Sequence, residues 1–242
     1  MDKEQLHRIR TAYDSTVRDF KAGINPLAAV PQKFKKSKAF KSFLKETDPV
    51  VSGSGAPDIK AFLQPKPGMK CLDVGCCANL ATQRFDKWPS TYYGADISPV
   101  LIQEMKKFAT EAGIKIGGLE VAEMKDLPFS SSFFDIAMVI GVFEYVSMDY
   151  AVLSFKELFR VLKPGARMVL DLPNLTHPHV ETMFQLEEYL QRPNIPKSRE
   201  QFEHTLKPLF SIVKTNEKHV MLKYFVEKKC EVDTNCSLSV SS

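Results

Sequence analysis

A turn of small residues follows an apolar segment near the middle of the chain. The run CLDVGCCANLAT, residues 71–82, has the pattern of a buried strand, a tight turn and the start of a helix. Ligands of parallel α/β sheets bind at the carboxyl ends of the strands, and small residues there let the backbone approach a ligand closely. The next apolar segment ends in Asp96, a side chain suited to accept hydrogen bonds from two ribose hydroxyls. Together these residues predict a nucleoside-binding site.

A dinucleotide-binding site is the competing interpretation of this region. Such sites need a GxGxxG turn, because a helix N-terminus there holds a pyrophosphate. Here Gly75 is followed by Cys77 and Asn79, so the glycine pattern is absent. The sequence therefore favours a ligand that carries a nucleoside but no phosphate.

Alternating apolar and amphipathic segments indicate the elements that position these residues. Segments that are apolar throughout are typical of parallel strands buried on both faces, and helices between them indicate βαβ units. We expect an α/β fold with a doubly wound, mostly parallel sheet of seven strands. The expected strands cover residues 69–75, 91–98, 118–121, 133–142, 166–174, 210–214 and 219–226, and the expected helices cover residues 1–21, 59–64, 80–86, 99–112, 150–162, 177–190 and 201–206.

Composition limits the class of protein. The chain has 242 residues, 44% of them hydrophobic and 26% charged, as in an ordinary globular domain. No apolar run is long enough to span a bilayer, and MDKEQLHRIR lacks the apolar core of a signal peptide. We therefore expect a cytoplasmic protein. The five cysteines show no paired CxxC spacing, so we predict no metal site. Their number is odd and no export signal is seen, so we expect reduced thiols.

The segment from Lys33 to Lys45 carries six lysines interleaved with apolar residues. The favoured interpretation is an amphipathic helix with a solvated basic face. Two alternatives remain open, since the same surface would attract RNA or anionic lipid head groups. The formal net charge of +4 permits such partners without arguing for them.

Several motifs in the same order and spacing resemble the class I methyltransferases that use S-adenosylmethionine (SAM), in particular the small-molecule enzymes related to ubiquinone-biosynthesis methyltransferases. The resemblance covers about residues 68–175. Its motifs are LDVGCCAN, GADIS, AEMKDLPF, FFDIAMVIGVFEYV and ELFRVLKPGARMVL. It implies a Rossmann-like methyltransferase fold, with SAM as the methyl donor.

The resemblance also implies which residues contact SAM. Asp96 would bind the ribose, Glu123 would face the adenine amino group and Met124 the adenine ring, while Tyr13 would belong to an N-terminal lid. Two positions depart from the family pattern, because Cys77 and Asn79 stand where glycine is usual. Cys77 could narrow the pocket, contact the sulfonium region or weaken binding. The complete predicted set of cofactor-binding residues is Tyr13, Asp73, Gly75, Cys77, Asn79, Asp96, Ile97, Glu123, Met124 and Ile140.

A general base is needed only where the methyl acceptor must lose a proton, because SAM is already activated. Glu144 and Tyr145 follow the fourth expected strand, and His177 follows the fifth, so all three would lie at the carboxyl edge of the sheet. Histidine titrates near neutral pH. We name Glu144, Tyr145 and His177 as candidate catalytic residues, although histidines at a helix start are often surface or capping residues.

These inferences give one overall hypothesis. Residues 1–64 form a helical lid, residues 65–229 a SAM-binding domain with a cap at about 175–207, and residues 230–242 a disordered tail. The protein transfers a methyl group from SAM to an O, N, S or C atom of a small molecule. The alternatives are an RNA-modifying methyltransferase, a partner-binding protein without turnover, and a membrane-associated protein. The acceptor and the oligomeric state do not follow from the sequence.

Overall fold

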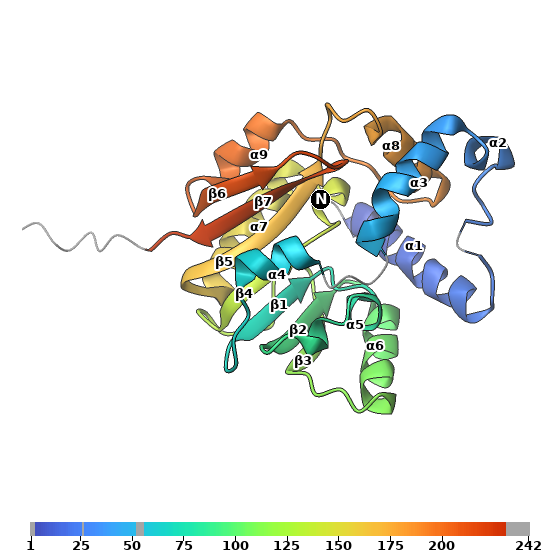
Figure 1. The fold of residues 1–242 in the computed structure, drawn as a ribbon. Helices are drawn as coiled ribbons and strands as arrows, with labels where there is room; N and C mark the ends of the chain where they lie inside the picture. Colours follow the sequence, from blue (N-terminus) through green and yellow to red (C-terminus); the bar gives the residue numbers. More distant parts are fainter. Residues whose placement is uncertain (1–2, 26, 52–55, 231–242) are drawn as a thin grey trace, which may run out of the picture.

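A seven-stranded sheet forms the centre of the computed structural model, which describes residues 3–25, 27–51 and 56–230 (Figure 1). The strand order is β3-β2-β1-β4-β5-β7-β6. β7 lies between β5 and β6 and runs in the direction opposite to the other six strands of this sheet. The order reverses between β1 and β4, which creates the switch point where doubly wound folds bind ligands. The predicted fold class is confirmed. The strands are β1 (Lys70–Val74), β2 (Thr91–Asp96), β3 (Gly118–Val121), β4 (Phe134–Val139), β5 (Leu162–Pro173), β6 (Phe210–Asn216) and β7 (Met221–Lys228).

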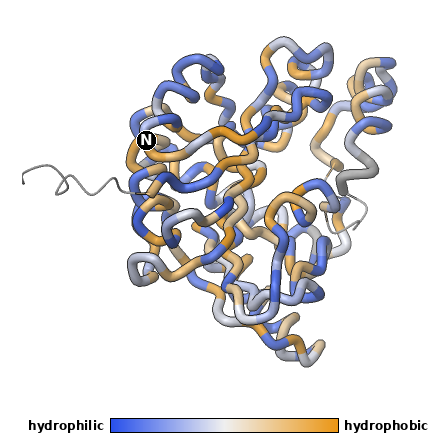
Figure 2. The backbone as a smooth tube through the Cα atoms, turned by 60° about the vertical axis from the view of Figure 1, so that its left-hand side comes forward, coloured by the Kyte–Doolittle hydropathy of each residue, from blue (hydrophilic) through white to orange (hydrophobic). Residues whose placement is uncertain are grey.

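Helices cover both faces of the sheet because its strands are apolar on both sides. Along β4, Ile136 and Met138 pack on the layer that contains α4 and α6. The alternating residues Ala137 and Val139 pack on the layer that contains α7 and α9. Figure 2 shows apolar residues concentrated along the interior segments. The helices are α1 (Lys3–Lys21), α2 (Gln32–Lys35), α3 (Lys38–Val51), α4 (Pro57–Leu63), α5 (Asn79–Thr82), α6 (Pro99–Glu111), α7 (Met148–Val161), α8 (Val180–Tyr189) and α9 (Arg199–Leu206), with 3-10 turns at Phe85–Lys87 and Phe143–Tyr145.

Two expected helices are wrong in detail. The helix expected over residues 80–86 is divided into α5 and a 3-10 turn, because Arg84 adopts a left-handed backbone (φ 54°) that ends the first. Asp86 holds the Arg84 guanidinium through two hydrogen bonds, at 2.8 and 2.9 Å. The basic segment likewise forms α2 and α3 instead of one helix, and the Ser37 hydroxyl accepts the Phe40 N–H at the start of the second.

The fifth and seventh strands also have different limits from those expected. β5 begins at Leu162, since this residue already pairs with Phe134 of β4, and so the strand includes the Lys163–Gly165 turn signal. β7 begins at Met221, two residues later than expected. The tail beyond residue 230, including Cys236, lies outside the described residues, so its expected disorder stays a prediction.

The N-terminal helices lie to one side of the sheet beside α8 (Figure 1). Phe40 and Phe43 of α3 are buried in a small core of their own with Val180 and Met183 of α8. The aromatic face of the basic segment is therefore inside the protein, as the amphipathic interpretation predicts. Among the described helices, none combines the length and the apolar character that a membrane span needs.

Candidate functional site

A cavity of about 260 Å³ lies at the carboxyl ends of β1, β2 and β4, next to α1. This is the ligand position that the switch point of the sheet predicts. Its wall combines apolar side chains of α1 with the turns that follow the three strands. Ten of the predicted site residues line it: Tyr13, Gly75, Cys77, Asn79, Asp96, Ile97, Met124, Ile140, Glu144 and Tyr145.

The turn after β1 is built for close backbone contact. Gly75 has φ 70°, and a Cβ at this position would lie 2.3 Å from Val142 Cγ2, so any other residue would be strained and would displace Val142. Its N–H and that of Cys76 both donate to the Ala95 carbonyl, at 2.8 and 3.1 Å. These bonds fix the turn against the end of β2.

Cys77 occupies a strained position in the same turn. Its φ of 41° lies in the left-handed region, which costs a side chain with a Cβ roughly 1–2 kcal/mol. Burial, aided by the nearby Asp96 carboxylate, raises the pKa of the thiol to about 11. The thiol is therefore protonated at neutral pH and is neither a nucleophile nor a soft metal ligand in that form.

Asp96 is held by backbone donors on both carboxylate oxygens. Oδ2 accepts the Cys77 N–H and Oδ1 the Ser98 N–H, each at 2.9 Å. The Ser98 hydroxyl also donates to Asp14 on α1. Burial and the nearby Asp14 carboxylate raise the pKa of Asp96, while the two N–H donors oppose that shift. A carboxylate accepts about four hydrogen bonds, so Asp96 at the cavity wall keeps acceptor capacity beyond these backbone donors.

Asp73 lies beneath the cavity and is not part of its lining. Its Oδ2 accepts hydrogen bonds from the Tyr92 hydroxyl at 2.8 Å and from Asn79 Nδ2 at 3.1 Å. Burial raises its pKa to about 7, and Oδ1 has no hydrogen-bond partner among the described residues. Asp73 therefore acts on the site by fixing the side chain of Asn79, which does line the cavity.

Of the two predicted adenine contacts, one lines the cavity and the other does not. Met124 is buried and lines the cavity. Glu123 is absent from the cavity lining, forms a bridge with Asp126 and pairs with Lys125 at 3.2 Å.

Tyrosines from α1 and from the turn after β4 meet at the cavity wall. The Tyr13 hydroxyl donates to the Tyr145 hydroxyl at 3.2 Å, and Tyr145 donates to Glu187 at 2.9 Å. Glu187 pairs with Arg192 at 3.3 Å, and the Arg192 guanidinium lies 4.5 Å from the centre of the Tyr13 ring. Burial raises the pKa of both tyrosines. This chain of contacts joins α1 to the segment that follows α8.

Glu144 is a buried acid, 7% exposed, at the edge of the cavity. Its Oε2 finds no hydrogen-bond partner in the described part of the chain. Burial, and then the carboxylate of Asp171, raise its pKa well above the usual range. Burial also raises the pKa of Asp171 to about 7, and Asp171 accepts the Gly141 N–H at 2.8 Å. The two acids thus form an interacting pair whose protonation is easily shifted.

Lys197 adds a cation beside this pair of acids. It is 3% exposed and donates to the carbonyls of Phe143 and Ile195. Burial lowers its pKa to about 8, and Glu144 opposes the shift. The lysine ties the segment after α8 to the turn that carries Glu144.

His177 lies away from the cavity. Its Nε2 is 3.4 Å from Glu46 of α3, and its Nδ1 accepts the N–H of His179 at 3.2 Å. His179 and His219 approach the same carboxylate, at 3.8 and 4.0 Å. These residues join α3 to the start of α8 and to the β6–β7 turn, so this geometry gives His177 no access to the cavity. Within the described ranges no group of three or more His, Cys, Asp or Glu side chains is arranged to hold a metal ion.

Comparison with known proteins agrees with the fold. Residues 72–170 match a family model described as a methyltransferase domain. The chain is 24% identical to the ubiquinone biosynthesis O-methyltransferase of Xanthomonas axonopodis pv. citri (strain 306), over 62% of this chain and 61% of that one. It is 33% identical to squalene methyltransferase 1 of Botryococcus braunii, over 43% of this chain and 28% of that one. The chain thus spans less than two thirds of the length of these curated relatives.

A solved structure with the same fold is the geranyl diphosphate C-methyltransferase of Streptomyces coelicolor A3(2). Its TM-score is 0.63 at 15% identity, and the match covers 93% of this chain and 98% of that one. The fold is that of a Rossmann-like α/β protein, with a cavity at the switch point of its sheet. The methyltransferase-domain model covers residues 72–170, and with the curated relatives it supports the similarity to class I SAM-dependent methyltransferases. The resemblance predicted from the sequence is confirmed.

The sequence analysis missed Glu187, Arg192 and Lys197. All three belong to the region after β5, where the regular alternation of strands and helices ends. Arg192 and Lys197 lie in a segment with the pattern of a solvated loop, since proline and polar residues dominate it. Arg192 precedes Pro193 and Lys197 follows Pro196, and nothing in this local pattern indicates that the Arg192 side chain contacts Tyr13 or that Lys197 is buried.

Proposed function

We propose that this protein transfers the methyl group of SAM to a small-molecule acceptor. The observation that carries the proposal is Asp96 at the end of β2, with both oxygens held by backbone N–H groups and its carboxylate in the wall of the cavity. A carboxylate in this position of a doubly wound fold binds ribose hydroxyls. The methyltransferase family match supports SAM as the nucleoside ligand.

The cavity residues fit such a ligand in chemistry. Gly75 lets the turn after β1 pack against Val142, Asp96 offers acceptors for the ribose, and Met124, Ile97 and Ile140 provide apolar surface for adenine. SAM would supply a methyl group on a sulfonium, which is an excellent leaving group. The protein's part is to align the acceptor and to exclude water from the site.

Glu144 is the residue best placed to take a proton from the acceptor. It is buried, it lines the cavity and one of its oxygens is unpartnered among the described residues. Its raised pKa makes it a stronger base than an exposed carboxylate once it is ionised. Tyr145 lines the same wall, but its raised pKa keeps the hydroxyl protonated, so it acts as a hydrogen-bond donor.

The helices before the sheet serve as a lid in this proposal, and the segment around residues 175–207 serves as a cap. α1 supports the assignment because Leu6, Ile9 and Tyr13 form part of the cavity wall. A small-molecule acceptor and a cytoplasmic location remain proposals. No contact in the described residues favours RNA, since the aromatic side chains between the lysines of α3 are buried.

Calorimetric titration with SAM and with S-adenosylhomocysteine tests the proposal first. Micromolar binding of both, followed by transfer of a radiolabelled methyl group to a panel of thiols, amines and phenols, would support the enzyme. Binding without transfer to any acceptor would favour a partner-binding protein without turnover. The absence of binding at millimolar ligand would refute the nucleoside site.

A further inference from the structure

The basic segment of the sequence places a row of lysines on the surface of α3. Lys38, Lys41 and Lys45 are exposed and share one side of this helix, because residues three and four positions apart lie together. Phe40 and Phe43 occupy the opposite side and are buried in the small core shared with α8. The packing of the two aromatic rings therefore holds α3 in an orientation that turns its lysines to solvent.

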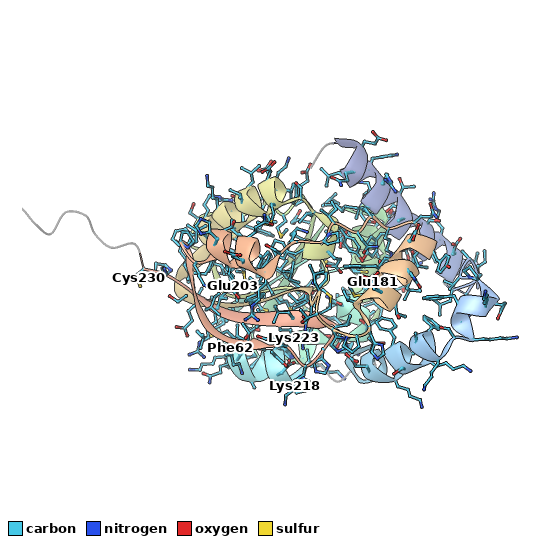
Figure 3. All side chains as sticks on the ribbon, turned by 90° about the horizontal axis from the view of Figure 1, so that it is seen from above. Phe62, Glu181, Glu203, Lys218, Lys223 and Cys230 are labelled. Atoms are coloured by element: carbon cyan, nitrogen blue, oxygen red, sulfur yellow. The ribbon has the colours of Figure 1, made fainter. Side chains whose placement is uncertain are left out.

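α2 extends this row of lysines. Lys33 of α2 and Lys36, which caps the C-terminal end of that helix, are also exposed. In Figure 3, long side chains extend from the blue N-terminal helices away from the body of the molecule. Among the described side chains no ion pair is found for the lysines of this surface. We call the surface the basic face, and its lysines are Lys33, Lys36, Lys38, Lys41 and Lys45.

The segment that carries the basic face has no negative charge of its own. Between Asp19 and Glu46 the chain contains neither aspartate nor glutamate. Glu46 accepts the Val220 N–H at 3.2 Å and lies 3.4 Å from Nε2 of His177, so its carboxylate is bound to the elements beneath α3. The charged side chains of residues 20–45 are therefore all positive.

The composition of the basic face favours a lipid surface as its partner. All of its cations are lysines, and the chain has no arginine between Arg18 and Arg84. Protein interfaces are depleted in lysine and enriched in arginine. Single-stranded nucleic acids stack their bases on aromatic side chains, but Phe40 and Phe43 are inside the protein. A layer of anionic head groups requires neither feature, because it attracts lysines by charge.

One apolar side chain lies on the border of the basic face. Leu44 of α3 is 41% exposed, and it follows Lys41 by three residues and precedes Lys45. Helices that lie on a bilayer combine lysines with leucine or aromatic side chains, which enter the boundary between head groups and acyl chains. Leu44 gives the basic face a side chain of this kind.

We propose that the basic face of α2 and α3 docks the protein on an anionic phospholipid bilayer. Its lysines pair with the head-group phosphates, and Leu44 enters the outer edge of the acyl layer. Such docking is peripheral and reversible, and salt weakens it. The inference is independent of methyl transfer, because no residue of the basic face lines the cavity at the strand ends.

Co-sedimentation of the whole chain with vesicles tests the inference. We expect binding to vesicles made of equal parts of phosphatidylcholine and phosphatidylglycerol, and no binding to vesicles of phosphatidylcholine alone. Binding to the mixed vesicles should decrease as the sodium chloride concentration rises, because salt screens the attraction between lysines and head groups. Equal binding to both kinds of vesicle, or binding to neither, would overturn the inference.

A triple substitution locates the contact on α3. The variant replaces three lysines by glutamine, which has nearly the same helix propensity: Lys38→Gln, Lys41→Gln and Lys45→Gln. Each lysine near an anionic surface strengthens binding about fivefold, so we expect a loss of roughly a hundredfold. The matched control removes three exposed lysines elsewhere and should bind like the wild type: Lys66→Gln, Lys106→Gln and Lys115→Gln. Both variants have the same net charge, so equal losses would mean that net charge governs binding and would overturn the inference.

Leu44→Ser tests the apolar part of the contact. The variant should bind the mixed vesicles about fivefold more weakly, because Leu44 loses contact with water when it enters the bilayer. Leu153→Ser is the control, since Leu153 on α7 is 50% exposed and lies outside the basic face. An unchanged affinity in Leu44→Ser would overturn the insertion of this side chain.

Competition with transfer RNA separates a lipid partner from a nucleic acid. The RNA is added to protein bound on the mixed vesicles, at a phosphate concentration equal to that of the accessible lipid. Protein that stays on the vesicles supports the bilayer as the partner. Protein that moves from the vesicles to the RNA would overturn the lipid assignment and make the basic face a nucleic-acid surface.

Discussion

The carboxylate of Asp96 accepts the backbone N–H of Cys77 at 2.9 Å, so the acid that ends β2 holds the strained turn that follows β1. Asp96 thus has two tasks, because it shapes the turn and offers lone pairs to a ligand. Asp96→Ala should weaken binding of S-adenosylhomocysteine by about 1–3 kcal/mol, the range for a lost hydrogen bond to a charged group. Calorimetry measures the loss, and Asp96→Asn, which keeps one acceptor oxygen, should lose less. An unchanged dissociation constant in the alanine variant would exclude Asp96 from the ligand site.

Cys77→Gly tests the cost of the left-handed backbone at φ 41°. Glycine relieves roughly 1–2 kcal/mol of strain but adds about 0.5–1 kcal/mol of unfolded-state entropy. The free energy of unfolding in urea should therefore stay equal or rise by up to about 1.5 kcal/mol. Cys77→Ala keeps the Cβ and the strain, so it should show no gain. A glycine variant that is less stable than the alanine variant would contradict a strained turn.

The elements with strong local signals were predicted well from the sequence. β3 lies at Gly118–Val121 and α6 begins at Pro99, both as expected, and Ser98 caps α6 by accepting the Leu101 N–H. Both rest on short-range chemistry, namely an apolar run and a capping side chain. The break at Arg84 could not be predicted, because a left-handed conformation in a residue other than glycine depends on contacts such as the one with Asp86.

Side chains of the candidate site were predictable where a strand end fixes their position. Asp96 ends β2 and Glu144 follows β4, and both line the cavity. Arg192 contacts Tyr13 of the cavity wall, but the two residues are distant in sequence, so no local pattern predicts this contact. The prediction for His177 failed for the same reason. Its position after β5 does not reveal that the side chain contacts Glu46 of α3 and not the cavity.

Asp171→Asn should shift the pH dependence of methyl transfer. A base must be ionised to act, so transfer through Glu144 should increase as pH rises through the raised pKa of this acid. Burial is the largest cause of the raised pKa of Glu144, and the Asp171 carboxylate is the second largest. Asparagine at position 171 removes that negative charge. The rising limb of the pH–rate profile should move to lower pH in Asp171→Asn and vanish in Glu144→Gln. A limb that survives in Glu144→Gln would exclude this glutamate as the base.

Tyr145→Phe should loosen the contact between α1 and the segment after α8. The variant loses the hydrogen bond from Tyr13 and the bond to Glu187, a charged group. Losses of about 0.5–1.5 and 1.5–3 kcal/mol are typical of such bonds, so the free energy of unfolding in urea should decrease by about 2–4.5 kcal/mol. Tyr93→Phe is the control, since Tyr93 contributes ring contacts with Phe129 and Phe133. Equal losses in both variants would show that the hydroxyl network contributes nothing specific.

Asp73→Asn should change how stability depends on pH. Burial raises the pKa of Asp73 from 3.8 to about 7, so between these values the folded protein binds more protons than the unfolded chain. The contribution of Asp73 to stability is therefore present in full at low pH and declines as pH rises through about 7. Asparagine does not titrate, so the free energy of unfolding of the wild type minus that of the variant should fall between pH 4 and pH 7 and level off above. Urea unfolding at intervals across this range measures the difference. A difference that stays constant with pH would mean that Asp73 keeps its ordinary pKa, and that Tyr92 and Asn79 satisfy a carboxylate that is ionised throughout.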